Sequence, residues 1–214
     1  NNNKKIFKKI KIKLTIVDHN SDDKVIEKFK KLLSQQFFKS EIINLDINFY
    51  KKKIKKLNQK GEKVTINQIS NMCNINQSFH IGKNCEDLIY FVEDDYIHKS
   101  ESLAEMLFAY EKFSSIFKDE IFILSTDYPY LYKNLSHSNI LIGENTHWRT
   151  VKESLLTFLT SKKMIEKYFD KLIDMATNRS NPFEKNLHEI YEKEKCFSPI
   201  PSLSIHCTNI NSVF

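Results

Sequence analysis

The chain has 214 residues, enough for one domain with a sizeable core, and its 41% hydrophobic and 12% aromatic residues exclude a disordered protein. Its net charge of +6 is concentrated in two lysine-rich segments, 4–13 and 51–63, which suit nucleic acid, an anionic membrane surface or a phosphate-bearing substrate. No apolar run approaches the about 20 residues that span a bilayer, and no signal-peptide pattern opens the chain. The four cysteines have no metal-ligand spacing, so we predict reduced thiols and a cytoplasmic location.

The first half of the chain alternates predicted strands and helices. Three segments have the apolar runs of strands (13–17, 41–47 and 88–92), and two have apolar residues at helical spacing (24–38 and 64–80). Strand, helix, strand, helix, strand is the rhythm of an α/β nucleotide-binding half. We therefore predict an α/β fold with a mostly parallel sheet flanked by helices. The three glycines of the chain leave no room for a glycine-rich phosphate loop.

Three acids follow the third predicted strand at the point where it leaves the core. Glu93, Asp94 and Asp95 would repel one another there, and burying them unpaired would be costly. A divalent cation would relieve both problems, and carboxylate oxygens suit Mg²⁺ or Mn²⁺. A solvated acidic turn before the next helix is the alternative. Because open α/β sheets bind ligands at the carboxyl ends of their strands, we predict a metal site.

The second half of the chain is less regular. We predict strands at 121–124, 140–142 and 154–160, and helices at 161–176 and 183–193. Another helix is predicted to begin at Ser102 with a capping box, in which Ser102 and Glu105 satisfy the first backbone amides. With no internal repeat and no low-complexity linker, the sequence predicts a single domain over residues 1–214.

Several segments resemble family 2 glycosyltransferases of the GT-A fold. Residues 17–21 (Val-Asp-His-Asn-Ser) look like the V-D-N-x-S segment of that family, and residues 87–96 look like the strand that carries its Asp-x-Asp metal motif. The segments 127–129, 147–149 and 197–203 resemble a bacterial branch of these enzymes. The resemblance covers about residues 11–97. It implies a GT-A-like, Rossmann-related sheet with a nucleotide-binding half at 11–98 and an acceptor half at 99–214. The strand and helix that precede V-D-N-x-S in the family are missing, so either the chain is truncated at Asn1 or residues 9–13 replace the strand.

The resemblance implies metal-dependent transfer of a sugar from a nucleotide-diphosphate donor, with inversion, to a glycan or lipid-linked acceptor of the cell envelope. Asp95 would ligate Mn²⁺ or Mg²⁺ directly, while Glu93 and Asp94 would hold the ribose or orient water on the ion. A late histidine, His206, would complete the metal site, although a lone histidine in an apolar strand is more often a hydrogen-bonded core residue.

Other residues would contact the nucleotide. Asp18 would accept a hydrogen bond from the base, with Asn20 and Ser21 beside it, unless Asp18 serves only in an Asx turn. Arg149 could pair bidentately with a phosphate or carboxylate.

The acceptor side needs a carboxylate that takes the proton from the attacking hydroxyl. Glu184 is the first candidate, because it lies where a loop turns into a helix. The alternative is that Glu184 is only an acid in the first turn of that helix, where the helix dipole favours a negative charge. Asp127 is the second candidate, and Glu153 and Glu189 follow. We expect an acceptor contact from Tyr128, His147 and Trp148, the last of which could instead fill the core.

Two other functions stay open. A phosphotransferase or nuclease would need a second acidic group for a second metal, which Asp18, Asp22 and Asp23 could supply. A nucleic-acid-binding module would use the lysines with Phe49 and Tyr50 nearby, but it leaves the acidic strand end unexplained, so we expect no nucleic acid. The lysine-rich segments serve as well for contact with an anionic membrane on the cytoplasmic face, where a lipid-linked acceptor would lie.

Overall fold

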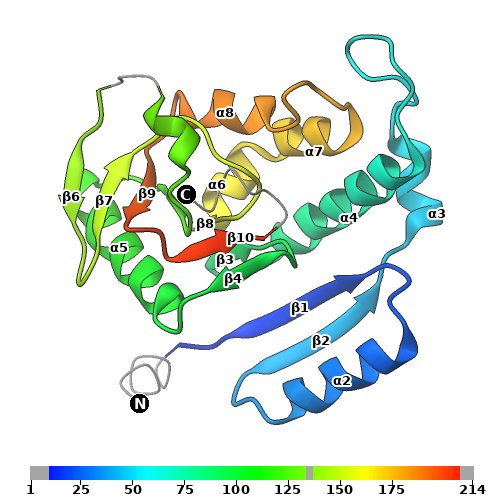
Figure 1. Cartoon of the computed structure of the whole chain (residues 1–214), viewed down its shortest axis with the longest axis horizontal. Coiled ribbons are helices and arrows are strands. Elements are labelled where there is room, and N and C mark those ends of the chain that lie inside the picture. Colours follow the sequence, from blue (N-terminus) through cyan, green and yellow to red (C-terminus); the bar gives the residue numbers. More distant parts are fainter. Residues whose placement is uncertain (1–9, 134–136, 208–214) are drawn as a thin grey trace. The chain divides into compact units, whose positions relative to one another are not determined.

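A computed structural model describes residues 10–133 and 137–207 and shows an α/β protein (Figure 1). Most of the lysine-rich segment 4–13 lies outside the described residues. The chain divides into two compact units, residues 1–80 with 176–179 and residues 81–175 with 180–214. No helix of the described residues is long and apolar enough to cross a membrane.

The first unit is built on a parallel strand pair joined by a helix. β1 (Lys13–Asp18) and β2 (Lys39–Asn44) run parallel, and α2 (Asp23–Ser34) connects them (Figure 1). The carboxylate of Asp22 caps α2 by accepting a hydrogen bond from the Lys24 amide at 2.8 Å. The predicted strand–helix–strand order is confirmed here, and so is the predicted parallel pairing.

The second strand ends earlier than the sequence pattern suggests. Its predicted range ran to residue 47, but a short helix, α3 (Ile47–Tyr50), begins there. Asp46 caps α3, since its carboxylate accepts from the Phe49 amide at 3.0 Å. A capping residue fixes where the extended chain must stop. The 3₁₀ helix η1 (Lys51–Lys53) follows, and α4 (Ile66–Gly82) confirms the predicted second helix.

The second unit contains a six-stranded sheet that is mostly antiparallel. Among the described residues, β5 and β9 are its one parallel pair. The mostly parallel sheet that we predicted is therefore not what this unit forms. One reason is the connection between the strands at 140–142 and 147–150. Its four residues, 143–146, can join only antiparallel neighbours. In sheet order the strands are β3 (Leu88–Phe91), β8 (Phe158–Ser161), β5 (Phe122–Leu124), β9 (Cys196–Ile200), β7 (His147–Thr150) and β6 (Ile140–Ile142).

Helices and a short strand pair complete the second unit. β4 (Tyr96–His98) pairs antiparallel with β10 (Ser204–His206). The predicted helix at 161–176 is two helices, α6 (Lys162–Lys167) and α7 (Phe169–Thr177), which are separated at Tyr168. The remaining elements are α5 (Ser102–Phe117), η2 (Pro129–Tyr132) and α8 (Lys185–Tyr191).

The predicted capping box at the start of α5 does not form. The Ser102 hydroxyl donates to the carbonyl of Leu203 at 2.5 Å, and Glu105 accepts from the Asn145 side chain at 2.6 Å. Both side chains are buried and used for long-range contacts. Tertiary partners have therefore displaced the local bonds that the sequence pattern suggested.

The core of the second unit lies where α5 packs on the sheet. Trp148 is fully buried in it, with its ring edge-on to Phe113 at a centroid distance of 6.3 Å. The packing of large rings and branched chains holds β5, β7, β8 and β9 at fixed positions. The buried members of this cluster are Met106, Ala109, Tyr110, Phe113, Ile121, Ile123, Trp148, Leu159, Phe197 and Leu203.

We predict that Gly82→Ala destabilises the protein. A Cβ at Gly82 would lie 2.5 Å from the ring of Phe91 and 2.8 Å from the side chain of Ile89, so these side chains or the end of α4 must move. Overpacking of this kind costs about 1–3 kcal/mol of unfolding free energy, which urea denaturation would measure. Glu86→Ala, at an exposed site nearby, is the control and should change the stability little. A Gly82→Ala variant as stable as the control would show that the structure accommodates a Cβ at this position without loss of stability.

Candidate functional site

The two predicted metal ligands lie in direct contact although 111 residues separate them in the chain. His206 Nε2 is 2.8 Å from Asp95 Oδ2, and the rings of His206 and Tyr96 stack with centroids 4.6 Å apart. The β4–β10 pairing brings them together, because His206 is the register partner of Tyr96. The Cys207 amide also donates to the Asp95 carbonyl at 2.7 Å.

β10 is anchored to the end of β5, which fixes the position of His206. The amides of Leu203 and Ser204 donate to the carbonyl of Ser125 at 2.9 and 3.0 Å. The hydroxyl of Ser204 lies within hydrogen-bond distance of the Ser125 and Thr126 hydroxyls, at 2.7 and 2.6 Å. Small hydroxyl side chains satisfy one another in this buried region. These hydrogen bonds therefore fix β10 and, with it, the position of His206.

The Asp95–His206 contact is a hydrogen bond, which fits the alternative of a hydrogen-bonded histidine, and its length is also near the separation of two ligands on one ion. Ligands at right angles on an ion with bonds of about 2.1 Å lie about 3 Å apart, close to the 2.8 Å observed. A carboxylate oxygen with an imidazole nitrogen suits Mn²⁺. No group of three or more His, Cys, Asp or Glu side chains in the described part of the chain is arranged to hold a metal. Two protein ligands suffice where substrate phosphates and water supply the others.

A group of carboxylates surrounds this pair. Burial raises the pKa of Glu93 from 4.5 to about 7, and the charges of Asp95, Glu184 and Asp94 add to the effect. Glu184 is about ninety residues away in the sequence, so the fold has brought it within electrostatic range of Glu93. We call Glu93, Asp94, Asp95, Glu184 and His206 the acidic site.

Glu184 occupies the N-cap position of α8, but its side chain makes no capping hydrogen bond. Its backbone carbonyl accepts from the amides of Leu187 and His188 at 2.8 and 2.9 Å. The helix itself is held by Asn186, whose side-chain amide donates to the carbonyl of Lys171 at 2.9 Å. The carboxylate is therefore not occupied in starting the helix, while the backbone that carries it is fixed.

Tyr130 is a member of this neighbourhood that the sequence reasoning missed. Burial raises its pKa to about 12, and the charges of Glu153 and Glu184 contribute. Its ring stacks on that of Tyr128, with centroids 5.5 Å apart. The only signal in the sequence is its place directly after Asp-Tyr-Pro, a segment singled out for other reasons. Glu153, a lower-ranked candidate for the base, is exposed and lies near the same tyrosine.

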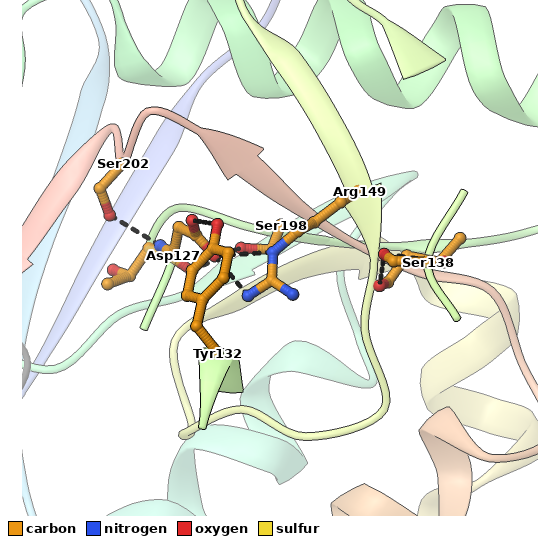
Figure 2. A network of polar contacts seen from close by, with 8 residues as sticks. Asp127, Tyr132, Ser138, Arg149, Ser198 and Ser202 are labelled. Atoms are coloured by element: carbon orange, nitrogen blue, oxygen red, sulfur yellow. Dashed lines mark hydrogen bonds and ion pairs between the residues drawn. The ribbon is translucent and has the colours of Figure 1, made fainter. Parts of the chain in front are cut away.

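Asp127 and Arg149 form a buried ion pair (Figure 2). The Arg149 Nε and Nη2 atoms donate to Asp127 Oδ1 at 3.0 and 2.7 Å, and the Ser198 hydroxyl donates to the same oxygen at 3.2 Å. The Tyr132 hydroxyl donates to Asp127 Oδ2, and the guanidinium lies 4.2 Å from the Tyr132 ring centre. The Asp127 and Arg149 side chains are only 10% and 8% exposed.

These contacts change how both residues are interpreted. Asp127 has both carboxylate oxygens engaged, which argues against its use as the base. The charge of Arg149 is already matched by a carboxylate within the same unit, the bidentate type of partner that the sequence suggested for it. A buried charge pair of this kind mainly fixes the chain around it, here η2 and β7.

The predicted acceptor residues separate into buried and exposed. Trp148 lies in the core and offers no face to a sugar, so the alternative that it fills the core is the correct one. Tyr128 is also buried, and its hydroxyl shares a hydrogen bond with that of Tyr96. His147 is exposed. Strand geometry explains the difference between His147 and Trp148, because neighbours in β7 point to opposite faces.

The predicted base-binding residues lie at the end of β1, in the first unit. The Ser21 amide is 3.4 Å from Asp18 Oδ2, a long Asx-type contact, and Asn20 has a left-handed backbone with φ of 62°. α4 fixes this end of the strand, since Asn74 donates to the Val17 carbonyl at 3.0 Å and Ser70 Oγ lies 2.7 Å from His19 Nδ1. The acidic site belongs to the second unit. Glu189, the last candidate base, pairs with Lys171 at 2.5 Å.

No protein-family model matches the chain, and no curated protein matches it either.

We predict that Glu93 makes stability depend on pH. Its pKa is about 7 in the folded protein, whereas an ordinary glutamate has 4.5. Between these values the folded state keeps a proton that the unfolded chain releases, so the free energy of unfolding falls as the pH rises. Glu93→Gln should lack this contribution. Between about pH 5 and about pH 7, the free energy of unfolding measured by urea denaturation should fall in the parent by on the order of 1–3 kcal/mol more than in Glu93→Gln. Glu144→Gln, at an exposed position, is the control. Equal pH dependence in parent and Glu93→Gln would contradict the assignment.

Proposed function

We propose that the chain is a metal-dependent glycosyltransferase. It would move a sugar, with inversion, from a nucleotide-diphosphate donor to a glycan or lipid-linked acceptor. The observation that supports this best is the contact between Asp95 and His206, which joins the two expected ligands from distant parts of the chain. The presence of Glu184 in the same group of acids supports it further.

Asp95 and His206 would hold the cation, Mn²⁺ or Mg²⁺. A bound divalent ion would neutralise the departing diphosphate as a Lewis acid. Glu93 and Asp94 would then contribute hydrogen bonds to the ribose or to water on the ion. Burial and then the charges of the neighbouring carboxylates raise the pKa of Glu93, and a positive charge at the site would relieve that repulsion.

Glu184 would act as the base that removes the proton from the attacking hydroxyl. The competing candidate, Asp127, has both oxygens occupied by Arg149, Ser198 and Tyr132. Glu184 is half-buried, on a helix that is held by long-range bonds, and near other acids.

The GT-A-like fold is part of this proposal. The β1–α2–β2 unit is the parallel arrangement expected of the nucleotide-binding half. β3 leads directly into the acids at its carboxyl end, as the family's metal strand does. Apart from β3, every strand of the six-stranded sheet, with its antiparallel pairs, lies in the segment assigned to the acceptor half.

A two-metal phosphotransferase or nuclease is less well supported. The second acidic group would have come from Asp18, Asp22 and Asp23. Asp22 is used to cap α2, and Asp18 contacts the Ser21 amide in a turn. These local roles account for two of the three acids without a metal.

We predict that Asp95→Asn loses transfer and metal-dependent nucleotide binding while the fold survives. The amide keeps the shape of the side chain, but it is a poor ligand for a hard cation. In a thermal-shift assay, nucleoside diphosphates with Mn²⁺ should stabilise the parent and not the variant. Asp119→Asn, which alters an exposed ion pair with Lys195 outside the acidic site, should behave like the parent. Unchanged turnover of Asp95→Asn at saturating Mn²⁺ would eliminate Asp95 as a ligand.

We predict that Glu184→Gln lowers turnover by about 10²–10⁴-fold and leaves donor affinity nearly unchanged. Glutamine keeps the size and the hydrogen-bonding reach but cannot take up the proton. Turnover with a panel of nucleotide sugars and calorimetric donor binding would be measured together. Loss of donor binding in step with activity would instead make Glu184 a binding residue.

Asp127→Asn is the matched comparison for Glu184→Gln. It should act through stability, because it leaves the buried guanidinium of Arg149 without its charge partner, a loss of about 3–5 kcal/mol. Normal stability combined with lost turnover in Asp127→Asn would return Asp127 to the role of base.

A further inference from the structure

Residues 49–66 of the first unit form a basic surface element, here called the lysine loop. It runs from Phe49 through η1 and a tight turn to Ile66 at the start of α4. In Figure 1 the turn is the narrow loop that extends away from α3. The lysine loop includes the second of the two lysine-rich segments found in the sequence.

The backbone of the lysine loop is well fixed. The Asn58 side chain accepts from the amides of Lys60 and Glu62, both at 2.9 Å, and the Val64 amide donates to the Lys56 carbonyl at 2.9 Å. Gly61 supplies the positive φ of 79° that the turn requires. Ile54 and Val64 are buried beneath it. The side chains on its surface are therefore presented from an ordered frame.

The charge of the lysine loop is strongly one-sided. It carries seven lysines, all exposed, and none forms an ion pair with another described residue. Its one acid, Glu62, accepts a hydrogen bond from Asn58 at 2.7 Å. Several lysines in the second unit differ, since Lys152, Lys167 and Lys171 each pair with a glutamate. A concentration of unmatched positive charge attracts an anionic surface.

Large apolar side chains are exposed among these lysines. Leu57 is 55% exposed and Ile66 is 83% exposed. A nucleic acid offers phosphates to the lysines but little to an aliphatic chain, whereas a bilayer offers both phosphates and an apolar interior. The Phe49 ring is 50% exposed and adds to this apolar surface, and both aromatic rings of the loop already have side-chain partners. The Lys53 ammonium lies 4.2 Å from the Phe49 ring centre, and Tyr50 packs against Phe49 and His80.

We propose that the lysine loop binds the anionic face of a lipid bilayer. The lysines contact the headgroup phosphates, and Leu57 and Ile66 enter the interfacial region. The binding goes beyond sugar transfer and does not depend on it, because neither donor nor acceptor takes part.

The test is co-sedimentation of the full chain with vesicles. Vesicles of equal parts phosphatidylglycerol and phosphatidylcholine should bind the protein, and vesicles of phosphatidylcholine alone should not. Binding should weaken as salt is added. A triple variant, Lys52→Gln with Lys55→Gln and Lys56→Gln, should lower the partition coefficient by about 100-fold, since each lysine contributes about fivefold.

A matched triple variant controls for net charge. Lys99→Gln, Lys118→Gln and Lys193→Gln remove the same charge from exposed lysines of the second unit that form no ion pair in the described part of the chain. This variant should bind vesicles like the parent. The double variant Leu57→Ser with Ile66→Ser keeps every charge and should still bind more weakly. Thermal unfolding of each variant would verify its fold.

Three results would overturn the proposal. One is an equal loss of vesicle binding in the two lysine variants, which would assign it to overall charge. Another is full binding by Leu57→Ser with Ile66→Ser. The third is absence of vesicle binding together with tight binding of a single-stranded oligonucleotide that the loop triple variant loses, which would identify a nucleic-acid surface instead.

Discussion

The second unit depends on how carboxylates are accommodated once they leave water. Glu93 is withdrawn from solvent with three other acids within electrostatic range, and the cost of that arrangement is expressed in its raised pKa. A histidine from a distant part of the chain is brought to one of these carboxylates. β10 brings His206 onto Asp95 by pairing with β4, and the hydroxyls after β5 hold β10 in place. The strand pair, although only three residues long on each side, therefore places a hydrogen bond to Asp95 within this group of carboxylates.

The parts of the fold that the sequence could predict are those governed by neighbouring residues. The β1–α2–β2 order follows from apolar periodicity and from Asp22, which can cap the helix because it precedes the apolar run. The boundary of β2 was displaced by another cap, Asp46, that the apolar pattern does not reveal. The pairing of Asp95 with His206 was expected from a resemblance to a family, not from any local pattern.

The parts that could not be predicted are those decided by distant partners. Which strands lie side by side in the six-stranded sheet depends mostly on packing across the whole unit, and only the short connection between β6 and β7 is a local signal of antiparallel pairing. Arg149 and Asp127 look like a phosphate-binding residue and a base in isolation, and their roles change only because the fold places them together. Alternation along β7 could have separated His147 from Trp148, had that segment been treated as a strand.

The engagement of Arg149 by Asp127 has a consequence for the order in which ligands would enter the proposed site. An arginine whose charge is already neutralised cannot offset the charge of an incoming diphosphate, so the acidic site would repel a nucleotide that arrives alone. Nucleotide and cation would then be thermodynamically coupled, each raising the affinity for the other by the same factor. The cation would behave as an obligatory co-ligand, and the nucleoside diphosphate and the ion would leave as one complex after transfer.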